Sequence, residues 1–339
     1  MLTVRQALDA VLRGRSLDAA AAESVFAEIL DDLVADPLVA ALLIALRMKR
    51  ESAAELTGAT RAMLQRARPL DLGPVLDTAG TGGDGAGTFN ISTGAALVAA
   101  AAGIPTAKHG NRAVSGRVGA ADVLEHFGVN LELEPPALRR CLTEAGICFV
   151  FAPAYHPVLA RLAVLRRTLA VRTIFNLMAP LANPARPRFQ LLGVAEPILL
   201  DPLAEALAAL GVHHALVVHG HDGLDEISLA APSSVIEITN GAVRRFEITP
   251  RAFGIREADP AALLTADAKE AVQILRAALA GDPGPARDIL ALNGGAAIYA
   301  GGGAPTLADG VRRAQEILAA GRPLATIERL RAASRHEVP

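Results

Sequence analysis

The chain has 339 residues, enough for about two domains of ordinary size. Hydrophobic residues make up 52% of the chain and charged residues 20%, so it can bury a core and fold without a partner. Its 33 basic and 35 acidic side chains give a net charge of −2, without the basic excess that a nucleic-acid binder normally shows.

The first seventy residues contain only helical patterns. Residues suited to helix N-caps precede four apolar stretches: Thr3 before a helix to residue 12, Ser16 before one to residue 30, Asp36 with Pro37 before 38–48, and Ser52 before one to residue 65. Ser52 and Glu55 also have the reciprocal spacing of a capping box. The pattern favours a helical packing or dimerisation module that ends near residue 70.

After Pro69, short apolar runs alternate with helical stretches. The predicted strands cover residues 75–79, 104–107, 148–151, 191–194 and 214–218. The helices between them cover residues 92–102, 120–127, 136–145 and 202–210. Such alternation predicts a largely parallel sheet covered by helices.

The last third of the chain predicts a hairpin followed by helices. Residues 234–239 and 242–248 flank Asn240-Gly241, a strong hairpin signal, and helical patterns broken by glycine-rich turns fill 267–333. The expected fold class is therefore α/β. We expect a small helical domain over residues 1–70, and over 71–339 a larger α/β domain whose mostly parallel central sheet is flanked by helices.

Cysteine use and hydropathy favour a cytoplasmic protein. Cys141 and Cys148 form no C-x-x-C pair, which excludes a disulfide framework and a cysteine-based zinc site and suits a reducing compartment. The N-terminus lacks the charged-then-apolar order of a signal peptide, and the longest uncharged apolar run, residues 94–105, is too short to span a bilayer. Aromatic residues amount to 3%, without tryptophan, so few side chains can stack on bases.

A glycine-rich loop over residues 80–85 follows the first predicted strand directly. Its four glycines in six positions allow positive φ angles and close approach of a ligand to the main chain. Successive amides in such a loop suit phosphate oxygens, and the next helix, near Ser92, adds an N-terminus that attracts anions. The alternative, on glycine content alone, is a flexible surface loop.

Two better-known phosphate motifs do not fit this loop. A dinucleotide fingerprint would start its helix within the motif and later supply an acidic residue for the ribose, where this chain has Lys108 and His109. A P-loop would close with Gly-Lys-Ser/Thr, which is absent here. The loop is therefore predicted to be a phosphate cradle of another kind.

Two further polar loops end later strands. Residues 108–112, Lys-His-Gly-Asn-Arg, can neutralise phosphate and hydrogen-bond a polar ligand, and they are expected to face the glycine loop at the carboxyl edge of the sheet. Asp225 and Glu226 supply hard oxygen ligands of the kind that Mg²⁺ prefers. A transition metal is disfavoured because no i,i+4 histidine pair lies on a helix. Solvated charged turns are the alternative for both loops.

Seven motifs, in this order, resemble the anthranilate phosphoribosyltransferase family over nearly the whole chain. They occupy residues 77–85, 88–93, 108–112, 155–157, 171–177, 180–184 and 223–226. The resemblance implies a Mg²⁺-dependent pentosyltransferase that moves phosphoribose from phosphoribosyl pyrophosphate to anthranilate and releases pyrophosphate, in tryptophan biosynthesis. It also implies a homodimer formed by the helical domain, which residues 165–185 would join.

The resemblance implies a set of site residues. Phosphoribosyl pyrophosphate would contact Gly80, Thr81, Gly82, Gly83, Asp84, Thr88, Asn90, Ser92, Thr93, Lys108 and Ala120. Anthranilate would contact Gly80, His109, Asn111, His156 and Arg166, whose guanidinium suits a carboxylate. Magnesium would be held by Ser92, Asp225 and Glu226. No catalytic acid or base is assigned, because an aniline nitrogen already carries its lone pair at neutral pH.

The chain also departs from the family pattern. Gly116, Val118 and Ala120 stand where hydroxyl side chains are common, and Ala179 stands where glycine is usual. These changes bear on donor affinity and acceptor identity. Alternatives are therefore a related transferase with another aromatic amine acceptor, a pyrimidine-nucleoside phosphorylase-like enzyme, or a non-catalytic nucleic-acid-binding relative; the net charge and the Asp225-Glu226 pair disfavour the last.

Overall fold

The computed structural model describes residues 2–112 and 118–335. The chain starts with four helices, α1 (Val4–Leu12), α2 (Ala19–Leu30), α3 (Asp36–Lys49) and α4 (Ala53–Arg66). The capping box at Ser52 and Glu55 is present at the start of α4. Asp18, not Ser16, caps α2, because its carboxylate accepts the Ala21 amide while the Ser16 hydroxyl bonds Lys49.

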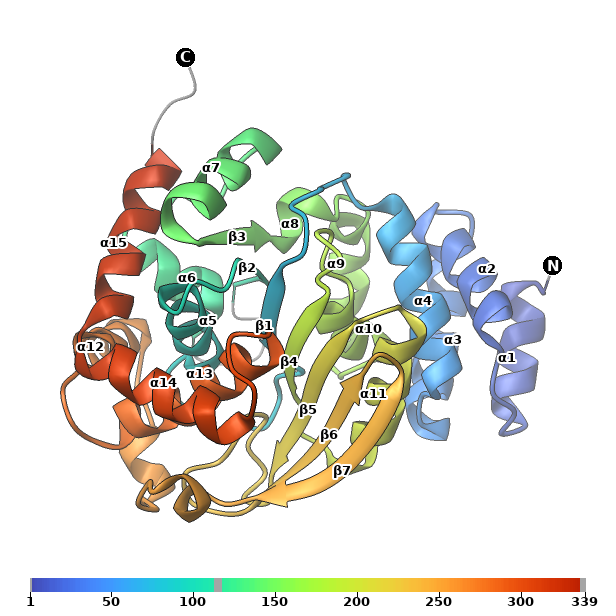
Figure 1. The fold of residues 1–339 in the computed structure, drawn as a ribbon. Coiled ribbons are helices and arrows are strands. Elements are labelled where there is room, and N and C mark those ends of the chain that lie inside the picture. Colours follow the sequence, from blue (N-terminus) through green and yellow to red (C-terminus); the bar gives the residue numbers. More distant parts are fainter. Residues whose placement is uncertain (1, 113–117, 336–339) are drawn as a thin grey trace.

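One seven-stranded sheet fills the centre of the rest of the described chain, in the order β3-β2-β1-β4-β5-β6-β7 (Figure 1). Its strands are β1 (Leu76–Gly80), β2 (Thr106–Gly110), β3 (Ile147–Phe151), β4 (Phe189–Gly193), β5 (His214–Gly220), β6 (Ser233–Thr239) and β7 (Ala242–Ile248). Strands β1 to β5 pair in parallel, while β6 and β7 pair antiparallel, as the Asn240-Gly241 turn predicts. Both turn residues have positive φ angles, 51° and 81°.

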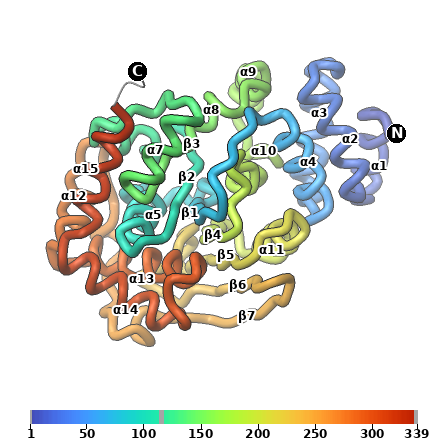
Figure 2. The backbone as a smooth tube through the Cα atoms, turned by 45° about the horizontal axis from the view of Figure 1, so that its top comes forward, coloured from blue at the N-terminus to red at the C-terminus, as the bar shows by residue number. Residues whose placement is uncertain are grey.

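Helices cover both faces of the sheet. The remaining helices are α5 (Ile91–Ala101), α6 (Ala120–His126), α7 (Pro135–Ala145), α8 (Ala152–Tyr155), α9 (Leu159–Leu169), α10 (Ile174–Met178), α11 (Leu200–Ala209), α12 (Ala268–Ala280), α13 (Pro285–Ala300), α14 (Leu307–Ala319) and α15 (Arg322–Arg335). Figure 2 shows α5 and α12 to α15 gathered on one side of the sheet, and α11 with α1 to α4 on the other. The predicted α/β class with a helical N-terminal part is confirmed.

Successive side chains along the strands point alternately into two separate hydrophobic cores. Leu191 and Leu216 pack in the core under α5 and α13, whereas their neighbours Leu192 and Val217 pack in the core shared with the four N-terminal helices. Side chains of α9 and α10, Leu162 and Phe175 among them, belong to this second core. The segment between β3 and β4 therefore packs with the N-terminal helices although it lies far from them in the sequence.

The chain order places a crevice beside β1. From β1 the chain moves outward through β2 to β3, and then returns to the other side of β1 as β4. Ligands in such sheets bind at the carboxyl ends of the strands where the order reverses. Gly80 at the end of β1 pairs with Gly193 at the end of β4, so this point falls at the glycine loop.

None of the helices within residues 2–112 and 118–335 combines the length and apolar character needed to cross a membrane.

Candidate active site

A cavity of about 320 Å³ opens where the glycine loop meets the segment between β3 and β4. It unites predicted residues from several loops: Gly80, Thr81, Gly82, Gly83, Ser92, Lys108, His109, Asn111, Ala120, His156 and Arg166. Arg172, Phe175 and Ala179 also line it. All five predicted acceptor residues and seven of the eleven predicted donor residues therefore line one cavity.

The glycine loop leaves β1 with successive left-handed backbone angles. Gly82 and Gly83 have φ angles of 65° and 78°, which L side chains rarely adopt. The Gly82 amide donates to the Asp225 carboxylate at 2.7 Å, across the carboxyl end of the sheet. A Cβ at Gly80 would overlap that same carboxylate. Glycine is thus required at Gly80 for the close approach of Asp225, as well as at Gly82 for the turn.

Replacement of Gly193 by alanine is expected to lower the free energy of unfolding by about 1–3 kcal/mol, as overpacking does. The added methyl would overlap the main-chain oxygen of Asp225, so backbone must move. Chemical denaturation measures the change. Gly14→Ala is the matched control, because its φ of 73° is strained but its surroundings are open, and it should cost only about 1 kcal/mol. An equal cost for both variants would contradict the close approach.

Three acidic side chains gather under the loop. The charges of Asp84, Asp225 and Glu226 act on one another, so the three carboxylates lie close together. Burial and the neighbouring Asp84 charge raise the pKa of Asp225 to about 8. Burial and the Asp225 charge raise the pKa of Glu226 well above its usual range. The cluster carries more negative charge than its surroundings neutralise.

The acidic cluster suits a magnesium ion whose remaining ligands come from water and substrate. The raised pKa values of Asp225 and Glu226 reflect burial and the repulsion between neighbouring carboxylates, which a bound cation would relieve. The donors are carboxylate oxygens, which suit Mg²⁺. Within the described residues, no three His, Cys, Asp or Glu side chains converge tightly enough to hold a metal by themselves. Magnesium typically completes such a site with water and substrate phosphates.

Lys108 lies buried between the loop and the acidic cluster. Its ammonium donates to the Thr78 carbonyl at 2.7 Å and to the Ser92 hydroxyl at 3.2 Å. Burial lowers the pKa of Lys108, and the charges of Asp77 and Glu226 oppose that effect. Lys108 is therefore fixed by hydrogen bonds and lines the cavity beside the predicted donor site.

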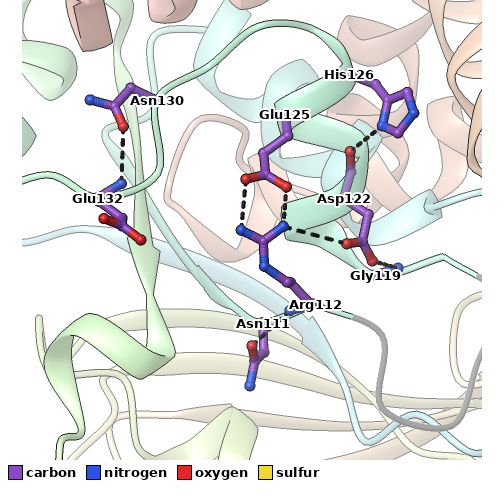
Figure 3. A network of polar contacts seen from close by, with 8 residues as sticks. All are labelled: Asn111, Arg112, Gly119, Asp122, Glu125, His126, Asn130 and Glu132. Carbon is purple, nitrogen blue, oxygen red and sulfur yellow. Dashed lines mark hydrogen bonds and ion pairs between the residues drawn. The ribbon is translucent and has the colours of Figure 1, made fainter.

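Arg112, the second cation of the 108–112 loop, lines the cavity but is already paired with a carboxylate. Figure 3 shows its guanidinium against Glu125 of α6, with a 2.7 Å bond from Nη2 and a longer ion pair to Asp122. The Glu125 carboxylate raises the pKa of Arg112. That both cations of the loop neutralise phosphate stays a prediction, and a phosphate would compete with Glu125 for Arg112. The neighbouring Gly116 lies outside the described residues.

The far side of the cavity carries an unpaired arginine. Arg166 of α9 stacks over the Phe175 ring, with 5.8 Å between the guanidinium carbon and the ring centroid. No carboxylate from residues 2–112 or 118–335 lies within ion-pair distance of it. Burial alone lowers the pKa of Arg166. A desolvated guanidinium in this position suits a planar anionic ligand.

Two neutral histidines flank Arg166 in the cavity. The rings of His109 and His156 lie 5.4 Å apart, edge to face. His156 donates from Nε2 to the Ala182 carbonyl at 2.8 Å, and the Ala179 carbonyl lies near the His109 ring. This leaves His109 Nε2 and His156 Nδ1 buried without a partner in the described chain. Burial lowers the pKa of both imidazoles, that of His109 to about 3, so both present lone pairs.

Some predicted residues do not line the cavity. Asn90 caps α5 and bonds the Thr93 side chain, so these two polar groups satisfy each other. Thr88 forms an isolated bridge with Leu264, and Asp84 lies against Asp225. Asp225 and Glu226 lie behind the glycine loop rather than on the cavity wall.

The departures from the family pattern fall in two places. Ala120 and Ala179 line the cavity, whereas Val118 packs against the main core. Arg172 is the residue that sequence reasoning missed: it lines the cavity and donates to carbonyls of the glycine loop. Its motif, residues 171–177, was visible in the sequence, but nothing in the residue pattern places an arginine there opposite the loop.

Comparison with known proteins gives two family matches and close relatives. Residues 5–67 match the glycosyl transferase family, helical bundle domain, and residues 72–324 match the glycosyl transferase family, a/b domain. The anthranilate phosphoribosyltransferase of Chloroflexus aggregans is 46% identical over 339 residues, which cover 99% of this chain and 100% of that one. That of Thermomicrobium roseum is 47% identical, covering 96% of each chain.

Solved structures agree in fold. The anthranilate phosphoribosyltransferase of Thermus thermophilus superposes with a TM-score of 0.92 at 41% identity, covering 97% of this chain and 99% of that one. The Saccharomyces cerevisiae enzyme in complex with PRPP (phosphoribosyl pyrophosphate) and Mg gives 0.83 at 26% identity, covering 98% and 93%. The same yeast enzyme with 4-fluoroanthranilate gives 0.81 at 25% identity, with the same coverage.

Proposed function

The chain belongs to the anthranilate phosphoribosyltransferase family, and we propose from this premise which of its residues bind each substrate of the family's reaction. That reaction is the Mg²⁺-dependent transfer of phosphoribose from PRPP to anthranilate, with release of pyrophosphate. The observation that carries the assignment is the single cavity that joins the glycine loop to the unpaired Arg166. An anion can lie at each end, with the reacting atoms between them.

The donor would bind at the loop end of the cavity. Gly80, Thr81, Gly82 and Gly83 offer backbone groups to the diphosphate, and Lys108 lies beside them with its charge already buried. Ser92 and Thr93 lie in the first turn of α5, whose N-terminus attracts anions, and Asn90 caps it. Asp84, Thr88 and Ala120 complete the proposed donor contacts. Support for this half comes from the left-handed loop backbone and the buried cation.

Magnesium would be held by Asp225 and Glu226, with Ser92 beside them. The closeness of the Asp84, Asp225 and Glu226 charges supports this proposal, because neighbouring buried carboxylates favour a cation between them. When bound, Mg²⁺ would supply neutralisation of diphosphate charge. The Gly82 amide donates to the Asp225 carboxylate, so the glycine loop directly contacts one of the proposed metal ligands.

The acceptor would bind at the other end. The Arg166 guanidinium would take the anthranilate carboxylate, and the Phe175 ring keeps that guanidinium in place. His109 Nε2 and His156 Nδ1 carry free lone pairs that can accept the N–H bonds of the acceptor amine, with Asn111 and Gly80 nearby on the wall. An imidazole with a pKa near 3 is a weak base, so these rings orient the amine rather than take its proton before attack.

The two neutral imidazoles make a testable pH prediction. At saturating PRPP and Mg²⁺, the KM for anthranilate is expected to stay flat between pH 8 and pH 6, because burial keeps both rings uncharged below the ordinary histidine pKa of about 6.5. Steady-state kinetics across that range measures it. A rise in KM centred near pH 6.5 that is absent in His156→Asn would contradict the assignment.

The arrangement explains how the chain would promote transfer. As pyrophosphate departs from the ribose C1, positive charge develops on the sugar ring and negative charge on the leaving group. The loop amides and Lys108 are fixed beside the leaving group and would stabilise its growing charge. The amine already carries its lone pair, so alignment of the two substrates by Arg166 and the loop would supply much of the rate.

A turnover assay tests the proposed activity. Anthranilate fluorescence should fall when the protein is mixed with PRPP and Mg²⁺, and it should stay constant when either one is omitted. The folded protein with all three components present and no loss of anthranilate would overturn the proposal. Aromatic amines other than anthranilate, tested in parallel, address the effect of Ala179 on acceptor choice.

We further propose the domain division and the assembly. The helical unit would comprise residues 1–70 joined by about 165–185, supported by the shared core of Leu162 and Phe175 with the N-terminal helices; the α/β unit would comprise 71–339. Large apolar side chains exposed in the helical part, Leu12, Leu33 and Met48, support a homodimer through the helical unit. Sedimentation at twice the mass of one chain would support the dimer, and a monomer would contradict it.

A further inference from the structure

Arg172 lies in the linker between α9 and α10, and its backbone is fixed on both sides. Ala170 ends α9 in a left-handed conformation with φ of 50°, which turns the chain toward the sheet. Thr173 lies at the N-cap of α10, where its backbone amide donates to the Asn176 side-chain oxygen at 3.1 Å. The arginine between these two turns therefore has a defined direction.

The Arg172 guanidinium grips two consecutive carbonyls of the glycine loop. Nη2 donates to the Thr81 carbonyl at 2.9 Å, and Nη1 donates to the Gly82 carbonyl. The same group occupies the space where a side chain at Gly83 would begin, since a Cβ there would overlap Nη1. A loop with positive φ angles and no side chains is thus held from one side by a single rigid fork.

These two bonds fix the direction of the loop amides. In a trans peptide the carbonyl and the following N–H point in opposite directions. The Thr81 carbonyl faces Arg172, so the Gly82 amide faces the other way, where it donates to Asp225 at 2.7 Å. The Gly82 carbonyl also faces Arg172, so the Gly83 amide is turned away from it, and this amide donates to no group in the described chain.

The two arginines of the cavity are distinguished by their contacts. Arg166 stacks on the Phe175 ring and has no carboxylate partner in the described chain. The Arg172 guanidinium instead donates hydrogen bonds to two main-chain carbonyls of the glycine loop. Arg172 is also attracted by the charges of Glu196 and Asp225, which oppose the cost of its burial. The Arg172 guanidinium therefore fixes the conformation of the glycine loop and also places a positive charge beside it.

We propose that Arg172 is a positioning residue that holds the glycine loop so that the Gly83 amide stays available to the diphosphate of the donor. The proposal rests on the assignment of that loop to PRPP. It predicts a selective effect: loss of the fork should loosen the loop and weaken donor binding, while the acceptor seat around Arg166 stays intact. Lysine can reach only one carbonyl with a point charge, so it should restore part of the effect.

Binding and kinetics on the intact protein test this. Titration calorimetry with Mg²⁺ and PRPP, and separately with Mg²⁺ and inorganic pyrophosphate, is expected to show about 10-fold weaker binding of both in Arg172→Ala, with about 3-fold weaker binding in Arg172→Lys. The KM for PRPP should rise by the same factors, and the KM for anthranilate should stay within about 2-fold of the unchanged protein. Arg167→Ala, which removes an exposed arginine of α9, is the matched control and should bind normally.

The outcomes separate the two proposals. If the unchanged protein binds PRPP with Mg²⁺ and Arg172→Ala or Arg172→Lys binds it equally well, the positioning role is wrong. If Arg172→Ala raises the KM for anthranilate instead, the arginine belongs to the acceptor seat and the role is also wrong. If the unchanged protein itself binds neither PRPP nor pyrophosphate, the assignment of the loop fails first. The lysine variant keeps the test valid where the alanine variant fails to fold.

Discussion

Substitution of Asp225 by asparagine is expected to lower kcat/KM by at least about a hundred-fold while raising the melting temperature. Asparagine keeps an oxygen that can accept the Gly82 amide, so the loop contact survives. It removes a buried charge that lies against Asp84 and beside Glu226. Because the raised pKa of Asp225 means that its ionised form is disfavoured in the folded state, the neutral replacement should stabilise the fold.

The measurement pairs a Mg²⁺ titration of activity with thermal unfolding. Half-saturation should move to about 10–100-fold higher Mg²⁺, as expected for loss of one anionic ligand. Glu205→Gln removes an exposed carboxylate of α11 and serves as the control for net charge. An unchanged Mg²⁺ titration would rule out Asp225 as a metal ligand, and a lower melting temperature would show that its charge is already compensated.

Substitution of Arg166 by alanine should raise the KM for anthranilate by about 10–100-fold, because hydrogen bonds to charged groups contribute about 1.5–3 kcal/mol each. Arg166 forms no ion pair with the described chain, so its removal breaks no structural salt bridge. The cost to stability should be small and limited to lost packing on Phe175. The KM for PRPP should remain close to its original value.

Steady-state kinetics with each substrate varied in turn measures this split. Arg167→Ala is again the control, because it removes the same charge from the next, exposed position of α9. Arg166→Lys should recover little, since an ammonium cannot bind a carboxylate with a planar fork. A larger effect on the KM for PRPP than on that for anthranilate would refute the carboxylate seat.

Local signals in the sequence predict much of this fold. Ser52 and Glu55 mark the start of α4, and Asn240-Gly241 marks the β6–β7 turn, because each depends on backbone chemistry within a few residues. The predicted start of α2 was wrong by two residues, because Ser16 and Asp18 are both suitable N-caps. Asp18 caps the helix, while the Ser16 hydroxyl accepts a hydrogen bond from Lys49. Only the folded chain brings Lys49 there.

The sequence predicted those parts of the candidate site that lie in loops directly after strands. The glycine-rich loop that starts at Gly80 follows β1, and the acidic pair at 225–226 follows β5; parallel strands bring such loops to one edge. Contacts across that edge were not predictable, because they depend on how segments far apart in the chain meet. Arg172 reaches the loop from the α9–α10 linker, and Arg112 pairs with Glu125 instead of facing phosphate.

The central claim is that the glycine loop and the Asp225-Glu226 pair together hold the diphosphate of PRPP through Mg²⁺. A crystal structure of this protein with PRPP and Mg²⁺ tests it most directly. It should show diphosphate oxygens within hydrogen-bond distance of the loop amides near Gly83, and Mg²⁺ between the diphosphate and the acidic pair. Diphosphate bound away from the loop, or metal bound without contact to Asp225 or Glu226, would contradict it.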